Sequence, residues 1–221
     1  MTPALLGAIL AHARAETPRE CCGLLIAAPG SLASYVPCRN IAEGEDEFRI
    51  HPEDWVNAED TGRVLGVVHS HPSGNLTPSE CDKANQRTMG IPWWIVVPET
   101  SEWARFGSSL AEGRTFAWGV EDCLSLVRDR LQGLPDFLRS PGFWKERDLF
   151  TDCAPLAGFY PVGEPEPGDV MLFGIKSEIP NHCAVYCGSG EILHHLPGRL
   201  SVQEPIGAWV QSLKTILRRA A

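Results

Sequence analysis

The chain has 221 residues, of which 43% are hydrophobic and 21% charged, as in an ordinary globular protein. Its formal net charge is −9, and its lysines and arginines form no cluster, which argues against a nucleic-acid partner. No apolar run approaches the roughly 20 residues that span a bilayer. The eight cysteines show no regular spacing, so we expect most of them to be reduced and packed as small apolar residues.

The first half of the chain predicts alternating helices and strands. Apolar residues recur with a helical period over 3–14, behind Thr2 and Pro3. No basic segment marks this stretch as a signal peptide, so we expect the chain to fold in a cytoplasm. The further predicted elements are strands near 22–27 and 32–37, a helix from about Pro52, a strand at 66–71, a helix from Thr77 and a strand at 92–97. The polar stretch 99–114 predicts a linker.

A second unit is predicted from about residue 115. It contains a helix at 121–132 that stops at Gly133, and an aromatic-rich stretch that reaches about residue 150. The other predicted elements are a turn at 165–169 and strands at 170–173, 182–187 and 191–195. The chain contains no internal repeat and no low-complexity tract.

Residues 66–82, GVVHSHPSGNLTPSECD, predict a metal site. His69 and His71 lie two residues apart on an expected strand, so they share one face, with Cα atoms ~7 Å apart. The turn and helix that follow return Asp82 toward them. Two histidines and one carboxylate leave a fourth tetrahedral position open, which is more typical of catalytic than of structural zinc. The alternative is a loop with surface histidines, but the ligand types, the turn and the helix start all agree with a site.

The start of that helix is predicted from its capping residues. Thr77 is a suitable N-cap, Pro78 suits the first helical position, and Glu80 suits the capping box. This start places Asp82 near the N-terminal end of the helix.

Cys123 is predicted in the first turn of the helix at 121–132. Backbone N–H groups and the helix dipole stabilise a thiolate there, which makes the thiol a better nucleophile at neutral pH. A cysteine nucleophile needs a base and often a third group that orients the base.

The segments 182–187 and 191–194 flank Gly188-Ser-Gly190 and predict a β-hairpin. If the hairpin is centred on Gly188, His182 and His194 lie directly opposite, with Cβ atoms ~5 Å apart. One imidazole can then accept the thiol proton while the other holds its tautomer. The alternative, a buried structural cysteine and two surface histidines, is equally consistent with the spacing, because spacing does not bring the helix to the hairpin.

Residues 1–108 resemble the JAMM (MPN+) metalloprotease domain, whose pattern is an upstream Glu, then His-x-His-Pro, then Ser-x-x-Asp. The matching residues are Glu20, His69-Ser-His71-Pro72 and Ser79-Glu-Cys-Asp82. The resemblance implies a Zn2+ ion held by His69, His71 and Asp82. It also implies that Glu20 is the general base that deprotonates a zinc-bound water, and that Ser79 helps to stabilise the oxyanion. Without the resemblance, Glu20 is an ordinary glutamate.

Residues 113–221 resemble the NlpC/P60 fold, a papain-like cysteine peptidase domain. The matching pieces are Trp118-Gly-Val-Glu-Asp-Cys123, Pro167-Gly-Asp169 and His182-x-x-x-Tyr-x-Gly188, which leads to His194. The resemblance implies that Cys123 is the nucleophile, His182 the base and His194 the orienting residue. The chain departs from the family at Phe116, where a tyrosine often supplies a hydroxyl to the oxyanion or the substrate.

Together the resemblances imply an α+β chain of two small domains, a JAMM-type (cytidine-deaminase-like) α/β/α domain and a papain-like NlpC/P60 domain. This order in so short a chain is similar to a family of tail-tip proteins of lambda-like siphophages. In that family the second domain carries Asp-Cys-x-Ser-Leu-x-Arg-Asp, which Asp122–Asp129 matches. The resemblance implies tip, hub and tail assembly proteins as partners. It also implies a location in the host cytoplasm during assembly and at the virion tail tip afterwards.

Two functions of different classes follow from these observations. In the first, the chain is a double peptidase. Its NlpC/P60 half hydrolyses peptidoglycan stem peptides at the bond between D-γ-glutamyl and the diamino acid, and its JAMM half is a zinc-dependent peptidase or isopeptidase. In the second, the chain is an assembly or plug component of the tail tip, and its two sites serve only assembly or folding.

Overall fold

The structure is a computed structural model of the chain, and it describes residues 1–28, 31–107, 111–131, 139, 142, 145 and 148–220. The chain divides into two compact units, Met1–Ser109 and Leu110–Ala221. Both units mix helices and strands, as the α+β expectation requires. The expected helix end at Gly133 and most of the aromatic-rich stretch lie outside the described residues.

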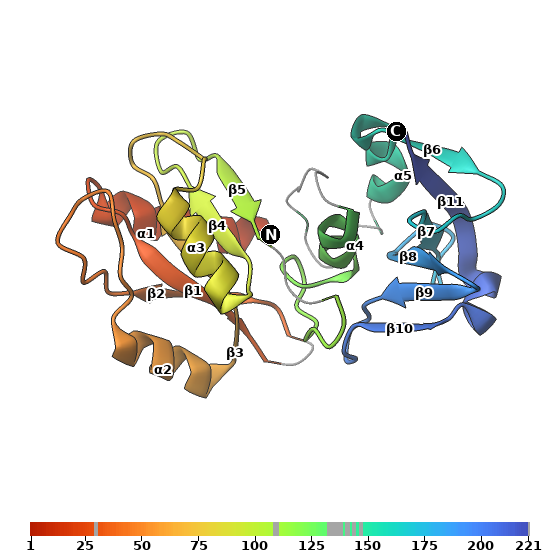
Figure 1. Cartoon of the computed structure of the whole chain (residues 1–221), viewed down its shortest axis with the longest axis horizontal. Helices are drawn as coiled ribbons and strands as arrows, with labels where there is room; N and C mark the ends of the chain where they lie inside the picture. The colour runs from red at the N-terminus through yellow and green to blue at the C-terminus, as the bar shows by residue number, and fades with distance from the viewer. Residues whose placement is uncertain are drawn as a thin grey trace. The chain divides into compact units, whose positions relative to one another are not determined.

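The N-terminal unit is a five-stranded mixed sheet with α1 and α2 on opposite faces (Figure 1). The strand order is β2-β1-β3-β4-β5, in which β3 and β4 are parallel and the other neighbours antiparallel. The helices are α1 (Pro3–Glu16), α2 (Pro52–Thr61) and α3 (Glu80–Met89). The strands are β1 (Cys22–Ala27), β2 (Ser34–Cys38), β3 (Arg63–Ser70), β4 (Trp93–Val96) and β5 (Trp103–Phe106).

The central strands of this sheet are apolar on both sides because helices cover both faces. Strand β1 is buried at all six positions. Its residue Leu24 joins Val67 and Trp93 in one core cluster with Ala58 of α2. Cys22 pairs with His69 across β1 and β3, so the first proposed metal ligand lies on the same face as this cluster.

Strand β5 lies inside the stretch 99–114, so the prediction of a linker over that whole stretch is wrong. The strand forms the edge of the sheet, with Trp103 opposite Val96 and Phe106 opposite Trp93. It is only four residues long and half-buried, which leaves too few positions for a clear alternation of apolar and polar residues.

The C-terminal unit is a six-stranded antiparallel sheet of order β10-β9-β8-β7-β11-β6. Its strands are β6 (Phe159–Val162), β7 (Val170–Phe173), β8 (His182–Gly188), β9 (Glu191–His194), β10 (Val202–Pro205) and β11 (Leu213–Arg219). The helices are α4 (Cys123–Leu131) and α5 (Leu149–Cys153), with 3-10 turns at Pro155–Ala157 and Gly207–Ser212. In the described part of the chain, no helix has the length and apolarity that crossing a membrane requires.

Alternate residues of β8 face two different cores. Cys183 and Val185 pack with Cys123 and Val127 of α4, whereas Ala184 packs in a second cluster with Trp209 at its edge. The start of α4 and the start of β8 therefore meet at one end of the sheet.

The hairpin of β8 and β9 turns at Ser189 and Gly190, both of which have positive φ, 53° and 77°. The pairing shifts between Tyr186 and Gly188, so Cys187 is an extra residue on β8. His194 consequently lies opposite Ala184. The expectation that His182 and His194 are directly opposite is therefore wrong, because the turn is centred one residue later than Gly188; the two side chains are diagonal neighbours on one face.

Candidate functional site

The two histidines of the first candidate site converge at the end of β3. The Nε2 atoms of His69 and His71 lie 3.1 Å apart, and both side chains are buried. His69 stacks on Phe48, with ring centroids 4.7 Å apart, and meets Trp93 edge-on. This packing fixes the His69 ring without using its Nε2 atom.

Asp82 completes the set of ligands predicted from the sequence. Its Oδ1 atom lies 3.6 Å from Nε2 of His69, and its Oδ2 atom lies 4.0 Å from Nε2 of His71. Burial alone would raise the pKa of Asp82, but hydrogen bonding with His69 and with Ser79 lowers it to about 2. The carboxylate is therefore ionised at neutral pH.

Ser79 is the N-cap of α3 and forms a capping box with Asp82. Its backbone N–H and its hydroxyl donate to Oδ2 of Asp82 at 2.8 and 2.7 Å, and the hydroxyl accepts from the Asp82 N–H at 3.1 Å. The prediction of Thr77 as the N-cap is wrong, because Ser79 takes that position. The Thr77 N–H donates to Oδ1 of Asn75 at 2.6 Å. In this arrangement Ser79 orients Asp82.

Glu20 lies two residues before the start of β1 and close to His71. Its Oε1 atom is 3.7 Å from Nε2 of His71. Glu20, His69 and His71 offer ligand atoms that all lie within 4.8 Å of one another. Burial, reinforced by repulsion from Asp82, raises the pKa of Glu20 to about 8, so this carboxyl is suited to exchange a proton near neutral pH.

The donor set fits a zinc ion. Tetrahedral ligands with zinc–nitrogen bonds of ~2.0–2.1 Å lie ~3.3 Å apart, close to the observed separations of His69, His71 and Asp82. The backbone carbonyl of Asn75 lies 2.7 Å from Nδ1 of His71. A proton held on Nδ1 by this carbonyl leaves the lone pair of Nε2 free for a metal.

An open groove of about 1060 Å³ leads to this cluster. Glu20, His71, Ser79 and Asp82 all line it. The rest of its lining includes the acidic residues Asp46 and Glu47 and the apolar residues Phe48, Ile50, Trp55, Pro78, Met89 and Trp93. The groove therefore reaches two of the three proposed metal ligands, His71 and Asp82.

The second candidate site is built at the N-terminus of α4. Asp122 caps the helix, because its Oδ1 accepts from the Ser125 N–H at 3.0 Å and Ser125 Oγ accepts from the Asp122 N–H at 2.8 Å. Arg139 forms a buried two-point ion pair with the same carboxylate, at 2.9 and 2.7 Å. This pairing opposes the effect of burial and holds the pKa of Asp122 well below its usual range. Cys123 is thereby fixed as the first residue of the helix.

Cys123 is a buried residue, with 7% of its surface exposed. A hydrogen bond with the Cys183 thiol lowers the pKa of Cys123 below its ordinary value. Burial opposes this effect, and the side chain of His182 supports it. Burial is the larger cause of a raised pKa of Cys183, and the hydrogen bond with Cys123 raises it further. Cys123 is thus the better nucleophile of the two, as expected for a cysteine at a helix N-terminus beside a histidine.

His182 and His194 are joined on the face of the sheet opposite Cys183. Nε2 of His182 lies 3.0 Å from Nδ1 of His194, and both rings are buried. Burial, reinforced by the charge of a protonated His182, lowers the pKa of His194 to about 4, so His194 is neutral at physiological pH. The structure therefore joins the two histidines to each other, and His182 also reaches far enough past the start of β8 to influence the Cys123 thiol.

Two further residues of this site were not predicted from the sequence. Glu204 of β10 accepts from His194 and from Trp209, at 2.9 and 3.1 Å. The ring of Trp209 lies 5.1 Å from that of His194. Strand β10 gave no clear sequence signal, because its residues are only half-buried or exposed.

Phe116 is buried and makes edge-on contacts with Trp118 and His195, each with ring centroids 5.0 Å apart. The position that often carries a tyrosine is thus filled by an apolar ring.

Comparison with known families matches two models to the chain. The model of prokaryotic homologs of the JAB domain matches residues 2–108, and the NlpC/P60 family model matches residues 113–219. Tail tip assembly protein K of Escherichia phage lambda is 42% identical over 160 residues, which cover 69% of this chain and 80% of that protein. Tail tip assembly protein K of Escherichia phage N15 is 36% identical over 228 residues, which cover 96% of this chain and 93% of that protein.

Solved structures similar to the chain include one described as "JAMM: A Metalloprotease-like Zinc Site in the Proteasome and Signalosome". It is 26% identical and covers 48% of this chain and 84% of its own, with a TM-score of 0.30. An NlpC/P60 family protein from Bacillus cereus ATCC 10987 is 14% identical and covers 94% of this chain and 66% of its own, with a TM-score of 0.35.

Proposed function

We propose that this chain, which belongs to the family of tail tip assembly protein K, is a double peptidase of a phage tail tip. The NlpC/P60 half hydrolyses peptidoglycan stem peptides at the bond between D-γ-glutamyl and the diamino acid. The observation that carries this proposal is the array of Cys123, His182 and His194, in which the nucleophile has a lowered pKa and the base is held by a neutral imidazole.

The reaction at this site uses His182 as base and then as acid. His182 accepts the thiol proton of Cys123, and the thiolate attacks the scissile carbonyl carbon to form a carbon–sulfur bond. The amine of the diamino acid leaves with the proton from His182, which breaks the peptide bond and leaves a thioester. Water, deprotonated by His182, then hydrolyses the thioester and restores the Cys123 thiol.

Two features of the α4 N-terminus support this step. Backbone N–H groups at the very start of α4, before Ser125, can donate to the oxyanion that forms on the carbonyl. Asp122 directs its carboxylate to Arg139 and to the backbone of Gly119 and Ser125 rather than to the thiol. Because Phe116 supplies no hydroxyl, the oxyanion of this chain depends more heavily on backbone donors than that of a tyrosine-containing relative.

The JAMM half is proposed to be a zinc-dependent peptidase or isopeptidase. His69, His71 and Asp82 would hold the ion, which supplies a Lewis acid next to the scissile carbonyl. Glu20 accepts a proton from the attacking water and delivers it to the leaving amine, a role that suits its raised pKa. Ser79 holds Asp82 in place, and its hydroxyl can help to stabilise the oxyanion only by turning away from Asp82.

The proposed partners are tail-tip proteins, including the tip, hub and tail assembly proteins, and the proposed substrate of the cysteine site is the peptidoglycan peptide. The chain would act in the host cytoplasm during assembly and at the tail tip of the virion during infection. Family membership supports this placement, since the relatives are named for tail tip assembly.

Complementation tests whether the phage needs either reaction. A phage that lacks this gene receives the wild-type chain, Cys123→Ala or His69→Ala, with Cys187→Ala and His51→Asn as matched controls outside the two sites. The proposal expects both controls to restore plaque formation and Cys123→Ala to fail. Full plaque formation with both site variants would instead favour the structural role in the tail tip.

A further inference from the structure

Glu204 lies at the far end of the proposed catalytic array. From Cys123 the side chains follow one another as His182, His194 and Glu204, with separations of 3.0 Å between the two imidazoles and 2.9 Å between His194 Nε2 and Glu204 Oε1. Val202 is directly opposite His194 in the β9–β10 ladder. Glu204, two residues further along β10, is therefore a diagonal neighbour of His194 on the same face.

A histidine in the third position leaves the direction of the hydrogen bonds undetermined. Nδ1 of a neutral imidazole can either donate or accept, depending on the tautomer. If Nδ1 of His194 donates, then Nε2 of His182 must accept, and the proton of His182 lies on Nδ1. That tautomer of His182 has no lone pair to accept the thiol proton, because its other nitrogen is already engaged.

An ionised carboxylate only accepts hydrogen bonds, so Glu204 removes this ambiguity. Nε2 of His194 must carry its proton in order to donate to Glu204, which makes Nδ1 of His194 an acceptor. Nε2 of His182 then donates to Nδ1 of His194. The lone pair of His182 is consequently left on Nδ1, the nitrogen available to Cys123.

We propose that Glu204 is a positioning residue which sets the tautomers of His194 and His182, so that the base can accept the proton of Cys123. This inference rests on the proposed function of the Cys123 site and adds a fourth member to its array. Glu204 does not touch the thiol and acts only through the two histidines.

The surroundings of Glu204 keep it ionised and in place. Arg199 donates to Oε2 at 2.8 Å and to Oε1 at 3.3 Å, and Trp209 Nε1 donates to Oε1 at 3.1 Å. Hydrogen bonding with Arg199, the largest cause, and with His194 lowers the pKa of Glu204 to about 2. Among the residues that the structure describes, the charged and titratable groups that face Glu204 are thus His194 from β9 and Arg199 from the loop before β10.

The negative charge also suits the intermediate state of the reaction. When His182 accepts the proton, its positive charge faces neutral His194, and the carboxylate of Glu204 lies one ring further on. The Trp209 ring, whose centroid is 6.3 Å from that of His182 and 5.1 Å from that of His194, covers both imidazoles. Charges in such a site interact more strongly than they do in water.

Nitrogen NMR of the full chain, with 15N-labelled histidine, reads the tautomers directly. His182→Gln and His194→Gln assign the two signals. We expect both rings to carry the proton on Nε2 in the wild-type chain at pH 7.5. In Glu204→Leu, His194 should move to the Nδ1-protonated form. In Glu204→Gln, whose amide oxygen still accepts from Nε2, the wild-type tautomers should remain.

Peptide release from purified sacculi provides the second readout. Loss of a correctly protonated base should lower the rate of Glu204→Leu by about 100-fold, whereas Glu204→Gln should retain most of the activity. Glu191→Gln, a substitution on the same hairpin outside the array, is the matched control.

Two results would overturn the inference: unchanged tautomers in Glu204→Leu, or equal loss of activity in the Gln and Leu variants. If the tautomers change as expected but the wild-type chain releases no peptide, the inference stands and the proposed function fails.

Discussion

Nε2 of His182 lies 3.0 Å from Nδ1 of His194, although the two residues are diagonal rather than opposite in the β8–β9 ladder. The imidazoles meet because both point to the same face of the sheet and both are buried. His182 is the first residue of β8, and its side chain helps to lower the pKa of Cys123 at the start of α4. The chemistry proposed for the C-terminal unit depends on this meeting point.

Replacement of Cys183 should make Cys123 less reactive at mildly acidic pH. Cys183 is the largest cause of the lowered pKa of Cys123, since its thiol donates to the thiolate. In Cys183→Ala the thiolate loses this donor, and its pKa rises. The pH at which iodoacetamide alkylates Cys123 at half its maximal rate, followed by peptide mass spectrometry, should therefore move upward. Cys187→Ala should leave that midpoint in place; an unchanged midpoint in Cys183→Ala as well would contradict the assignment.

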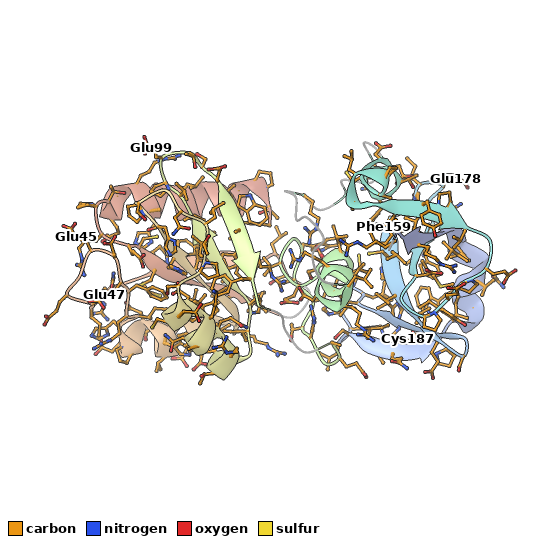
Figure 2. All side chains as sticks on the ribbon, turned by 45° about the horizontal axis from the view of Figure 1, so that its top comes forward. Glu45, Glu47, Glu99, Phe159, Glu178 and Cys187 are labelled. Atoms are coloured by element: carbon orange, nitrogen blue, oxygen red, sulfur yellow. The ribbon has the colours of Figure 1, made fainter. Side chains whose placement is uncertain are left out.

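Loss of the buried ion pair beside the nucleophile should destabilise the C-terminal unit. Asp122→Asn removes the carboxylate of a buried ion pair with Arg139, and breaking such a pair typically costs about 3 kcal/mol or more of the free energy of unfolding. The urea concentration at which the buried Cys183 becomes reactive reports on this unit alone. Glu178→Gln is a suitable control, because Glu178 is fully exposed at the periphery (Figure 2) and pairs only with Lys214 among the described residues. Equal midpoints for Asp122→Asn and the wild-type chain would show that the pair has no structural role.

Purification without a chelator should yield about one zinc ion per chain, as determined by elemental analysis. His69→Ala should lower the zinc content severalfold or more, because it leaves only two of the three proposed protein ligands, His71 and Asp82. His51→Asn is the control, since His51 caps α2 and asparagine is an equally good N-cap. A wild-type chain without metal, or a His69→Ala variant that retains it, would contradict the assignment of the ligands.

The metal-free chain should lose stability as the pH rises. Glu20 has a pKa of about 8 in the folded chain, above its ordinary value of 4.5, because of burial and the nearby Asp82. Its stabilising contribution is therefore complete below pH 4.5 and is lost as the pH rises through about 8. After chelation of the metal, the melting temperature of the wild-type chain should fall across this range more than that of Glu20→Gln. Parallel pH profiles for the two chains would mean that Glu20 is not buried beside Asp82.

Short-range patterns could be predicted from the sequence wherever a single local interaction decides the outcome. Helix α1 begins after Thr2 because its hydroxyl accepts from the Leu5 N–H, and α2 begins at Pro52 as expected. The two histidines and Asp82 converge because the end of a strand, a turn and the start of a helix follow one another within residues 66–82. The expected fold class is confirmed by the family matches to both halves.

Errors arose where two local solutions compete. Two pairs of residues have the spacing of a capping box, Thr77 with Glu80 and Ser79 with Asp82. Only the folded chain shows that the second pair forms the box. The turn at Ser189 and Gly190 depends on an extra residue at Cys187, which no alternation pattern reveals. Glu204 reaches His194 through a ladder between β9 and β10, and strand register of this kind is set by the fold as a whole.

The most direct test of the proposed double peptidase is the digestion of purified sacculi by the purified chain, with mass spectrometry of the released fragments. We expect fragments with a new amino group on the diamino acid, their complete loss in Cys123→Ala, and their retention in His69→Ala and Cys187→Ala. Release of the same fragments by Cys123→Ala, or none by the folded wild-type chain, would contradict the assignment of Cys123 as the nucleophile of a peptidoglycan peptidase.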